Sequence, residues 1–241
     1  MKFAGVIKDT RRIAVAVLAA IIAVAAAGAT AHASGATPAA AQASQGLSAL
    51  EVLDRLTEAR KGLNSYSVPI HFELVVHKGP SVSAKVDGVR YYQRPDREVL
   101  VLKSLPSIAR KFSYIYSGTG TPETWASAYD VSFAASSAPD AQTYELKAVP
   151  KTSGDISYAV LDVARDSPAA LGARVYYKNG GLVVLAFQNQ MVSGFVLPTV
   201  ETIDITFPEY KVHAVGRYGA YVINQTIPDS VWQTTPQTLP T

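Results

Sequence analysis

The stretch that most constrains the fold is the hairpin between Ala173 and Phe207. Two runs rich in β-branched and aromatic residues, 174–178 and 182–187, flank Asn179-Gly180-Gly181. Asn and Gly adopt the positive φ of a primed turn at low cost, so this pattern predicts two antiparallel strands. The run 182–187 is apolar on both faces, which indicates a curved sheet with one face toward an interior and the other under a helix.

Residues 1–33 have the pattern of a secretory signal peptide. A basic start precedes an uncharged apolar run from 13 to 28, and a small-x-small motif ends at Ala33. We therefore expect export to the periplasm and cleavage after Ala33. The alternative is a retained membrane anchor, for which the apolar run is short of the roughly 20 residues that span a bilayer. Arg11-Arg12 leaves the twin-arginine route open beside general secretion.

The leader also carries the excess charge of the chain. Four of the 22 Lys and Arg residues and one of the 19 Asp and Glu residues precede position 34, so 18 of each remain. A formally neutral exported part gives no electrostatic reason to expect nucleic acid as a partner. The sequence contains no cysteine. We therefore expect no disulfide, no thiolate metal site and no lipid-modified cysteine at the cleavage point.

The rest of the sequence divides by composition. An amphipathic helix is predicted over about 48–62, because Ser48 and Glu51 form a capping box ahead of apolar residues at three- and four-residue steps. A Ser, Ala and Gly-rich stretch from 104 to 142 interrupts the strands and contains a helix start at Thr121-Pro122. The predicted parts are a flexible linker at 34–46, a single domain at 47–232 and a disordered tail at 233–241.

Period-two alternation predicts a meander of antiparallel strands around this interruption. Gly88 breaks the alternation of the second strand and indicates a bulge. The predicted strands are 66–77, 82–92, 99–102, 144–149, 156–164, 173–178, 182–188, 200–207, 210–215 and 221–224.

No motif in the sequence predicts catalysis. His71 and His77 share a strand face but lie six residues apart, about 20 Å along a strand, which is too far to ligate one metal. With His213 they are interpreted as residues of a solvated outer face. No nucleophile elbow, phosphate loop or dinucleotide fingerprint is present. We expect no catalytic residue, metal or cofactor. Tyrosines beside the strands, such as Tyr92 and Tyr218, either pack within the sheet or line a ligand cavity.

Several short motifs in this order resemble one known group of proteins. They are the leading helix, the long strand from Tyr66, the run from Val89 through Arg94-Pro95-Asp96-Arg97, the strand end from Tyr144 to Lys151, Asn179-Gly180-Gly181 and Gly194-x-x-Leu197-Pro198. Together they resemble the LolA/LolB-like superfamily of periplasmic lipoprotein-sorting proteins. The resemblance implies a mainly β fold with helices (α+β): an unclosed, strongly curved antiparallel β-barrel with an N-terminal helix and a helical or loop lid on its concave face.

The resemblance also implies a hollow that accepts acyl chains and an arginine on a barrel strand that ties the lid. Candidates for that arginine are Arg90, Arg94, Arg97 and Arg174. Alternation along the strands, with the helix around Trp125, predicts the residues lining the hollow, although a shift by one residue would exchange the set for its neighbours. They are Phe72, Leu74, Val99, Val101, Trp125, Leu185, Phe187, Ile203 and Ile205.

Three functional hypotheses follow. The first is a monomeric exported carrier for the acyl chains of lipoproteins or lipids, within outer-membrane lipoprotein sorting. The second is a non-catalytic envelope-stress sensor or interaction module that binds an envelope membrane protein. The third, an enzyme, is the least favoured because no catalytic motif rises above chance.

Overall fold

The computed structural model describes residues 46–103, 121–135 and 142–233 of the chain. The predicted leader, the linker apart from Gly46, and the tail from 234 onward lie outside these ranges. Among the described helices, none is long and apolar enough to cross a membrane.

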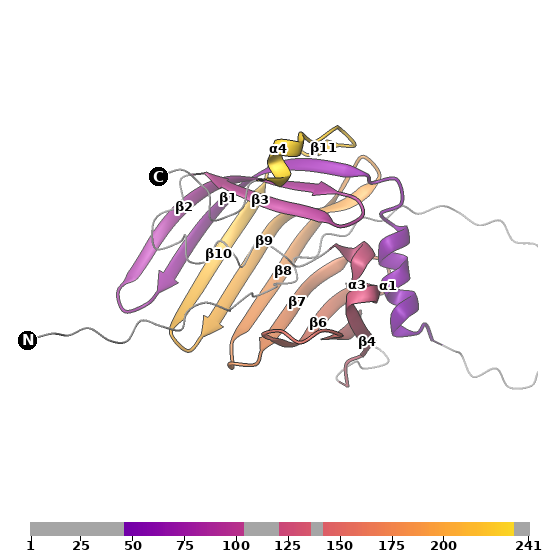
Figure 1. The fold of residues 1–241 in the computed structure, drawn as a ribbon, viewed down its shortest axis with the longest axis horizontal. Helices are drawn as coiled ribbons and strands as arrows, with labels where there is room; N and C mark the ends of the chain where they lie inside the picture. The colour runs from indigo at the N-terminus through magenta and orange to yellow at the C-terminus, as the bar shows by residue number, and fades with distance from the viewer. Residues whose placement is uncertain (1–45, 104–120, 136–141, 234–241) are drawn as a thin grey trace, which may run out of the picture.

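One antiparallel sheet forms the body of the protein (Figure 1). Its strand order is β3-β2-β1-β10-β9-β8-β7-β6-β5-β4, and the short β11 pairs with β1. The strands are β1 (Ser65–His77), β2 (Ser81–Gln93), β3 (Arg97–Lys103), β4 (Tyr129–Phe133), β5 (Thr143–Pro150), β6 (Ile156–Ala164), β7 (Ala170–Tyr177), β8 (Leu182–Val192), β9 (Phe195–Phe207), β10 (Tyr210–Tyr218) and β11 (Val222–Ile223).

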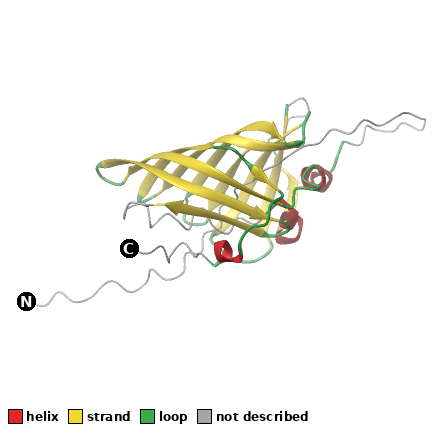
Figure 2. Cartoon of the chain, turned by 90° about the horizontal axis from the view of Figure 1, so that it is seen from above, coloured by secondary structure: helices red, strands yellow, loops and turns green. Residues whose placement is uncertain are grey.

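The sheet is curved and unclosed, with β3 and β4 at its two ends. Seen from above, the strands curl round while the helices gather at one side (Figure 2). The predicted fold class is therefore confirmed: mainly β, a strongly curved antiparallel sheet with a few helices. The β1–β10 pairing joins strands from the two ends of the domain, which places early and late sequence side by side.

Within the described ranges three helices accompany the sheet: α1 (Ala49–Glu58), α3 (Pro122–Ala128) and the short α4 (Asp229–Trp232). The predicted capping box of α1 is confirmed, because the Glu51 backbone N–H donates to Ser48 Oγ at 3.2 Å and the Ser48 N–H to Glu51 Oε2 at 2.7 Å. Helix α1 stands at one end of the strands with α3 beside it (Figure 1). Its buried face carries Val52, Leu53 and Leu56.

A large apolar cluster fills most of the inner side of the curved sheet, and a smaller one lies around Tyr66, Val68 and Leu197. Side chains alternate between the faces of each strand, so every second residue points inward. The register aligns these inward residues from strand to strand: Leu185 lies opposite Ala173 and Ile203, and Ile203 lies opposite Ala214. Helix residues Val52, Leu53, Leu56 and Trp125 join the same cluster. The core therefore lies between the sheet and the helices at its end.

Two sequence predictions about the strands are wrong. Gly88 does not form a bulge, since β2 pairs without a register shift through it. A Cβ at Gly88 would lie 2.8 Å from Leu102 Cδ2 and 2.9 Å from the Val101 carbonyl oxygen, so the glycine allows close packing of β3. The second apolar face of β8 lies under no described helix, because α1 and α3 pack on each other and on β4 while α4 packs on β3. Its residue Ala186 is exposed.

The central hairpin is confirmed, with a different turn from the one expected. Residues 178–181 connect β7 to β8, and of these only Gly180 has a positive φ, at 83°. The Asn179 side chain supports the turn by accepting a hydrogen bond from the Gly181 backbone N–H at 3.0 Å. The predicted helix start at Thr121-Pro122 is also confirmed, while β4 was not predicted.

Packing of α1 against the end of the sheet should contribute strongly to stability. Leu56 is fully buried, whereas Leu50 on the same helix is 50% exposed. We expect Leu56→Ala to lower the free energy of unfolding by about 2–5 kcal/mol, because it leaves a cavity. Leu50→Ala is the matched control and should change it by less than about 0.5 kcal/mol. Urea unfolding of both variants measures the difference, and equal effects would show that α1 is not docked as described.

Candidate binding site on the concave face

The concave face of the sheet carries the larger of the two buried apolar clusters among the described residues. Seven of the nine predicted lining residues belong to its buried cluster: Phe72, Leu74, Trp125, Leu185, Phe187, Ile203 and Ile205. The structure thus brings residues of four elements, β1, α3, β8 and β9, into one cluster. Whether the cluster binds cargo stays a prediction.

The predicted facing of β3 needs correction. Val99 and Val101 are half-buried and lie outside the cluster, whereas Leu100 and Leu102 belong to it. Leu102 lies opposite Gly88 and Leu100 lies opposite Arg90, and both of these β2 residues are buried. Side chains alternate along a strand, so a difference of one residue places Leu100 and Leu102 on the concave face and Val99 and Val101 on the opposite face.

A buried polar cluster interrupts the apolar face near the beginning of β1. At its centre, Arg90 Nη2 lies 3.1 Å from Glu201 Oε2, and Arg90 Nε lies 3.8 Å from Glu98 Oε1. The Tyr218 hydroxyl donates a hydrogen bond to the Glu201 carboxylate. The Arg90 guanidinium also stacks over the Tyr218 ring, 5.4 Å from its centroid. Charged groups buried this deeply require such partners, because the cost of removing them from water is large.

A second arginine connects this cluster to the helices. Arg60, only 1% exposed, donates from Nε to Glu123 Oε1 of α3 at 3.0 Å. The Tyr92 hydroxyl donates to the same oxygen at 2.9 Å, and the Arg60 guanidinium lies over the Tyr92 ring. Glu123 therefore fixes α3 to β2 and to the segment after α1. We refer to Arg60, Tyr66, Arg90, Tyr92, Glu98, Glu123, Glu201, Tyr218 and Tyr221 as the polar cluster.

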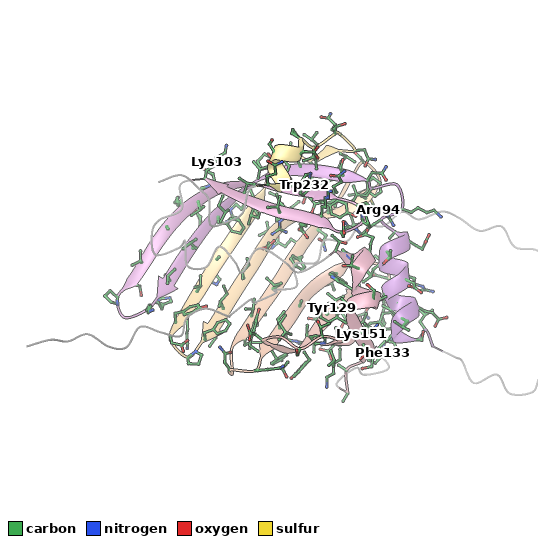
Figure 3. The ribbon with its side chains drawn as sticks, viewed as in Figure 1. Arg94, Lys103, Tyr129, Phe133, Lys151 and Trp232 are labelled. Atoms are coloured by element: carbon green, nitrogen blue, oxygen red, sulfur yellow. The ribbon has the colours of Figure 1, made fainter. Side chains whose placement is uncertain are left out.

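Further contacts hold α3 at both ends. The Lys151 ammonium donates to the Ala126 carbonyl oxygen at 2.8 Å, and the Thr121 hydroxyl donates to the Pro95 carbonyl oxygen. Tyr129, which follows α3, pairs with Pro150, so Lys151 lies beside the C-terminal end of the helix, where Figure 3 labels both Tyr129 and Lys151. The Trp125 side chain of α3 enters the apolar cluster with its ring nitrogen unpaired. Polar contacts and one large buried apolar side chain, Trp125, thus hold the helix in place.

None of the four arginines predicted to tie the lid makes a hydrogen bond or ion pair with the described residues of α3. Arg90 lies in the polar cluster, and Arg94 Nη1 donates to the Arg60 carbonyl oxygen at 3.0 Å. Arg97 lies over the Trp232 ring of α4, 5.8 Å from its centroid, and Figure 3 labels Trp232. Arg174 is on the outer face, paired with Glu145 and Asp162.

Sequence reasoning missed Arg60, although a signal for it exists. The apolar positions of the first helix include Leu56 and Leu63, and Arg60 follows Leu56 by four residues on the same face. A charged residue at the spacing of the buried apolar residues of a helix indicates that its side chain has a buried partner. Glu201 and Glu123 carried no comparable signal, because their partners lie far away in the sequence.

The histidines lie on the outer face, as predicted. His71 Nδ1 is 2.7 Å from Asp87 Oδ1, and His213 Nδ1 is 2.7 Å from Asp204 Oδ1, both pairs joining neighbouring strands. All four side chains are more than a third exposed. Within the described ranges, no group of three His, Asp or Glu side chains could hold a metal ion.

The tyrosines divide between the outer face of the sheet and the polar cluster, and a cavity-lining role for them stays a prediction. Tyr176 packs on the outer face, its ring stacked on Tyr158 at 4.4 Å between centroids. Tyr92 and Tyr218 belong instead to the polar cluster, with Tyr66 stacked on Tyr92 at 5.2 Å. Burial raises the pKa of the Tyr66 and Tyr218 hydroxyls well above 10, so both stay protonated donors.

Comparison with solved structures identifies the fold. The chain is similar to a LolA superfamily protein from Nitrosomonas europaea, with 14% identity, a TM-score of 0.52 and coverage of 77% of this chain and 97% of that one. It is also similar to a DUF1329 family protein from Desulfovibrio piger, with 16% identity, a TM-score of 0.53 and coverage of 75% and 93%. No protein-family model and no curated protein matches the sequence. The fold is LolA-like, as the sequence motifs suggested.

The polar cluster predicts a pH dependence of stability. Burial raises the pKa of the Glu98 carboxyl from its ordinary 4.5 to about 7, although the Arg90 guanidinium opposes the shift. The folded state holds this proton more tightly than the unfolded chain, so the Glu98 contribution to stability falls as pH rises from about 4.5 to 7. The loss amounts to roughly 3 kcal/mol.

Glu98→Gln should remove that slope, because the amide stays uncharged at every pH. We expect the free energy of unfolding of the variant to increase relative to that of the parent chain as pH rises. Urea unfolding at several pH values between 4.5 and 8 measures this difference. Glu58→Gln is the control, since the Glu58 side chain is 72% exposed. An unchanged slope in Glu98→Gln would contradict the assignment.

Proposed function

We propose that the protein is an exported, monomeric carrier that holds the acyl chains of lipoproteins or lipids against its concave face. The observation that carries this proposal is the contrast between the two faces of the sheet. The concave face carries a large buried apolar cluster, whereas the convex face carries cross-strand polar pairs such as Glu73 with Lys85 and Asp204 with His213. Only the concave face suits a hydrocarbon ligand.

Acyl chains match this face in chemistry and in energy. Each methylene group removed from water contributes about 0.8 kcal/mol, so a chain with ten buried methylenes gains roughly 8 kcal/mol. Binding of that strength needs no directional contacts along the chain. It also makes spontaneous release slow, so a carrier requires an element that moves.

Helix α3 is the element best suited to move. It has seven residues, too few to be stable on its own in water. The polar contacts of Glu123 and Lys151, with the buried Trp125 ring, hold it in place. Because the residues of the concave face are buried in this structure, cargo reaches them when a covering element lifts. We assign that role to α3 and call its contacts through Glu123 the latch.

The proposed compartment and process follow from the leader and the fold. A cleaved signal peptide places the mature chain in the periplasm, and the absence of cysteine means that the protein is not itself a lipoprotein. Outer-membrane lipoprotein sorting is the process that we propose for it, on the resemblance stated above. Binding and release involve no covalent step, so the proposed function is non-catalytic. Binding of an envelope membrane protein, as a sensor or interaction module, is the competing proposal.

Native mass spectrometry of the protein purified from its own cell envelope tests the carrier proposal. We expect a chain that begins at Ser34 and carries additional mass, which organic extraction identifies as acyl-containing material. A consistently cargo-free chain that still co-purifies with a membrane protein would contradict the carrier proposal and favour the interaction module.

Weakening the latch should accelerate exchange. Glu123→Ala removes the acceptor shared by Arg60 and Tyr92, so α3 should lift more often. We expect release of a bound fluorescent fatty acid, followed by stopped flow, to become about tenfold faster, which corresponds to roughly 1.4 kcal/mol of lost latch energy. Glu58→Ala, which removes an exposed carboxylate, is the control. An unchanged rate would show that this contact does not limit release.

A further inference from the structure

Three buried polar atoms of the polar cluster have no hydrogen-bond partner among the residues that the structure describes. They are Arg90 Nη1, the Tyr66 hydroxyl oxygen and Glu123 Oε2. The side chains of Arg90 and Glu123 are 3% and 5% exposed, and Tyr66 is 1% exposed. Buried polar groups in native proteins are almost always paired, so three unpaired atoms in one cluster point to a further bonding partner.

The three atoms come from three different elements that meet at one place. Tyr66 of β1 lies opposite Tyr92 of β2, and their rings stack at 5.2 Å. The Tyr92 hydroxyl is 2.9 Å from the other oxygen of Glu123, which α3 supplies. Arg90 precedes Tyr92 by two residues and therefore lies beside it on the same face of β2. Two unpaired donor groups of the sheet and one unpaired acceptor of α3 thus belong to the same buried cluster.

The charge of the cluster argues against an anionic ligand. It contains two arginines and three glutamates, with Arg90 already paired to Glu201 and Arg60 to Glu123. A carboxylate or phosphate placed here would lie near three acidic side chains without a free cation to neutralise it. A hydroxyl group fits better, because it accepts from Arg90 and Tyr66 and donates to Glu123.

We propose that the polar cluster binds the uncharged, hydroxyl-bearing head group of the amphiphile whose chains lie on the concave face. An acylglycerol is the matching ligand class. This inference rests on the carrier function proposed above and specifies its cargo. In the bound state the head group links β1 and β2 to Glu123, so cargo of the right class also holds α3 in place. Free fatty acids bind the same apolar face more weakly.

Tyr66→Phe tests the proposal by removing a single oxygen atom. The probes are 1-oleoylglycerol and oleate, each displacing the apolar dye N-phenyl-1-naphthylamine from the full chain at pH 8. We expect the parent chain to bind 1-oleoylglycerol at least about fivefold more tightly than oleate, and Tyr66→Phe to lose about fivefold affinity for 1-oleoylglycerol. Affinity for the dye should not change. Tyr176→Phe, on the outer face, is the matched control and should behave as the parent.

Each other outcome overturns the proposal in a recognisable way. If Tyr66→Phe is more stable but binds 1-oleoylglycerol as the parent does, the Tyr66 hydroxyl does not contact the ligand. Its partner is then an ordered water molecule, or it has none. If oleate binds as tightly as 1-oleoylglycerol, the cluster does not select uncharged head groups, while the carrier function stands. If neither probe nor the dye binds, the carrier function itself fails, and this inference fails with it.

Discussion

An unclosed curved sheet cannot bury its own inner face, and this constraint governs the rest of the structure. A closed barrel would cover that face by packing strand against strand, but here β3 and β4 form two separate edges. The inward residues of the strands therefore require other elements to cover them. Helix α1 does so through Leu53 and Leu56, and α3 through Trp125. A cover supplied by short helices can be displaced, which a packed barrel interior does not allow.

The polar cluster fixes how the covering helices are placed on the unclosed sheet. Buried ion pairs such as Arg90 with Glu201 add little net stability compared with apolar packing, but they fix which groups meet. Here they join β2, β3, β9 and the helices at the end of the sheet where α1 lies. The contacts of Glu123 hold α3 at one specific position, which apolar packing alone would not define. The same cluster carries the pH dependence and the inferred selectivity for head groups.

The sequence allowed much of the fold to be predicted, because local patterns reported it directly. Alternation located β6 at Ile156–Ala164 to the residue, and the Ser48 capping box located the start of α1. Strand β4 escaped because its five residues follow α3 without a break in a Ser and Ala-rich segment. The facing of Val99 and Val101 failed because β3 is apolar on both faces, so alternation cannot choose between them. The partners Arg90 and Glu201 are 111 residues apart, beyond any local pattern.

The carrier function requires that cargo occupies the concave face. Methyl NMR of the purified chain during titration with a fatty acyl ligand tests this, because it reports each face of the sheet separately. We expect chemical-shift changes at Leu185, Ile203 and Ile205 on the concave face, while Val184 and Val215 on the convex face stay unchanged. Shifts confined to Val184 and Val215, or no shifts at any of these methyl groups at saturating ligand, would contradict it.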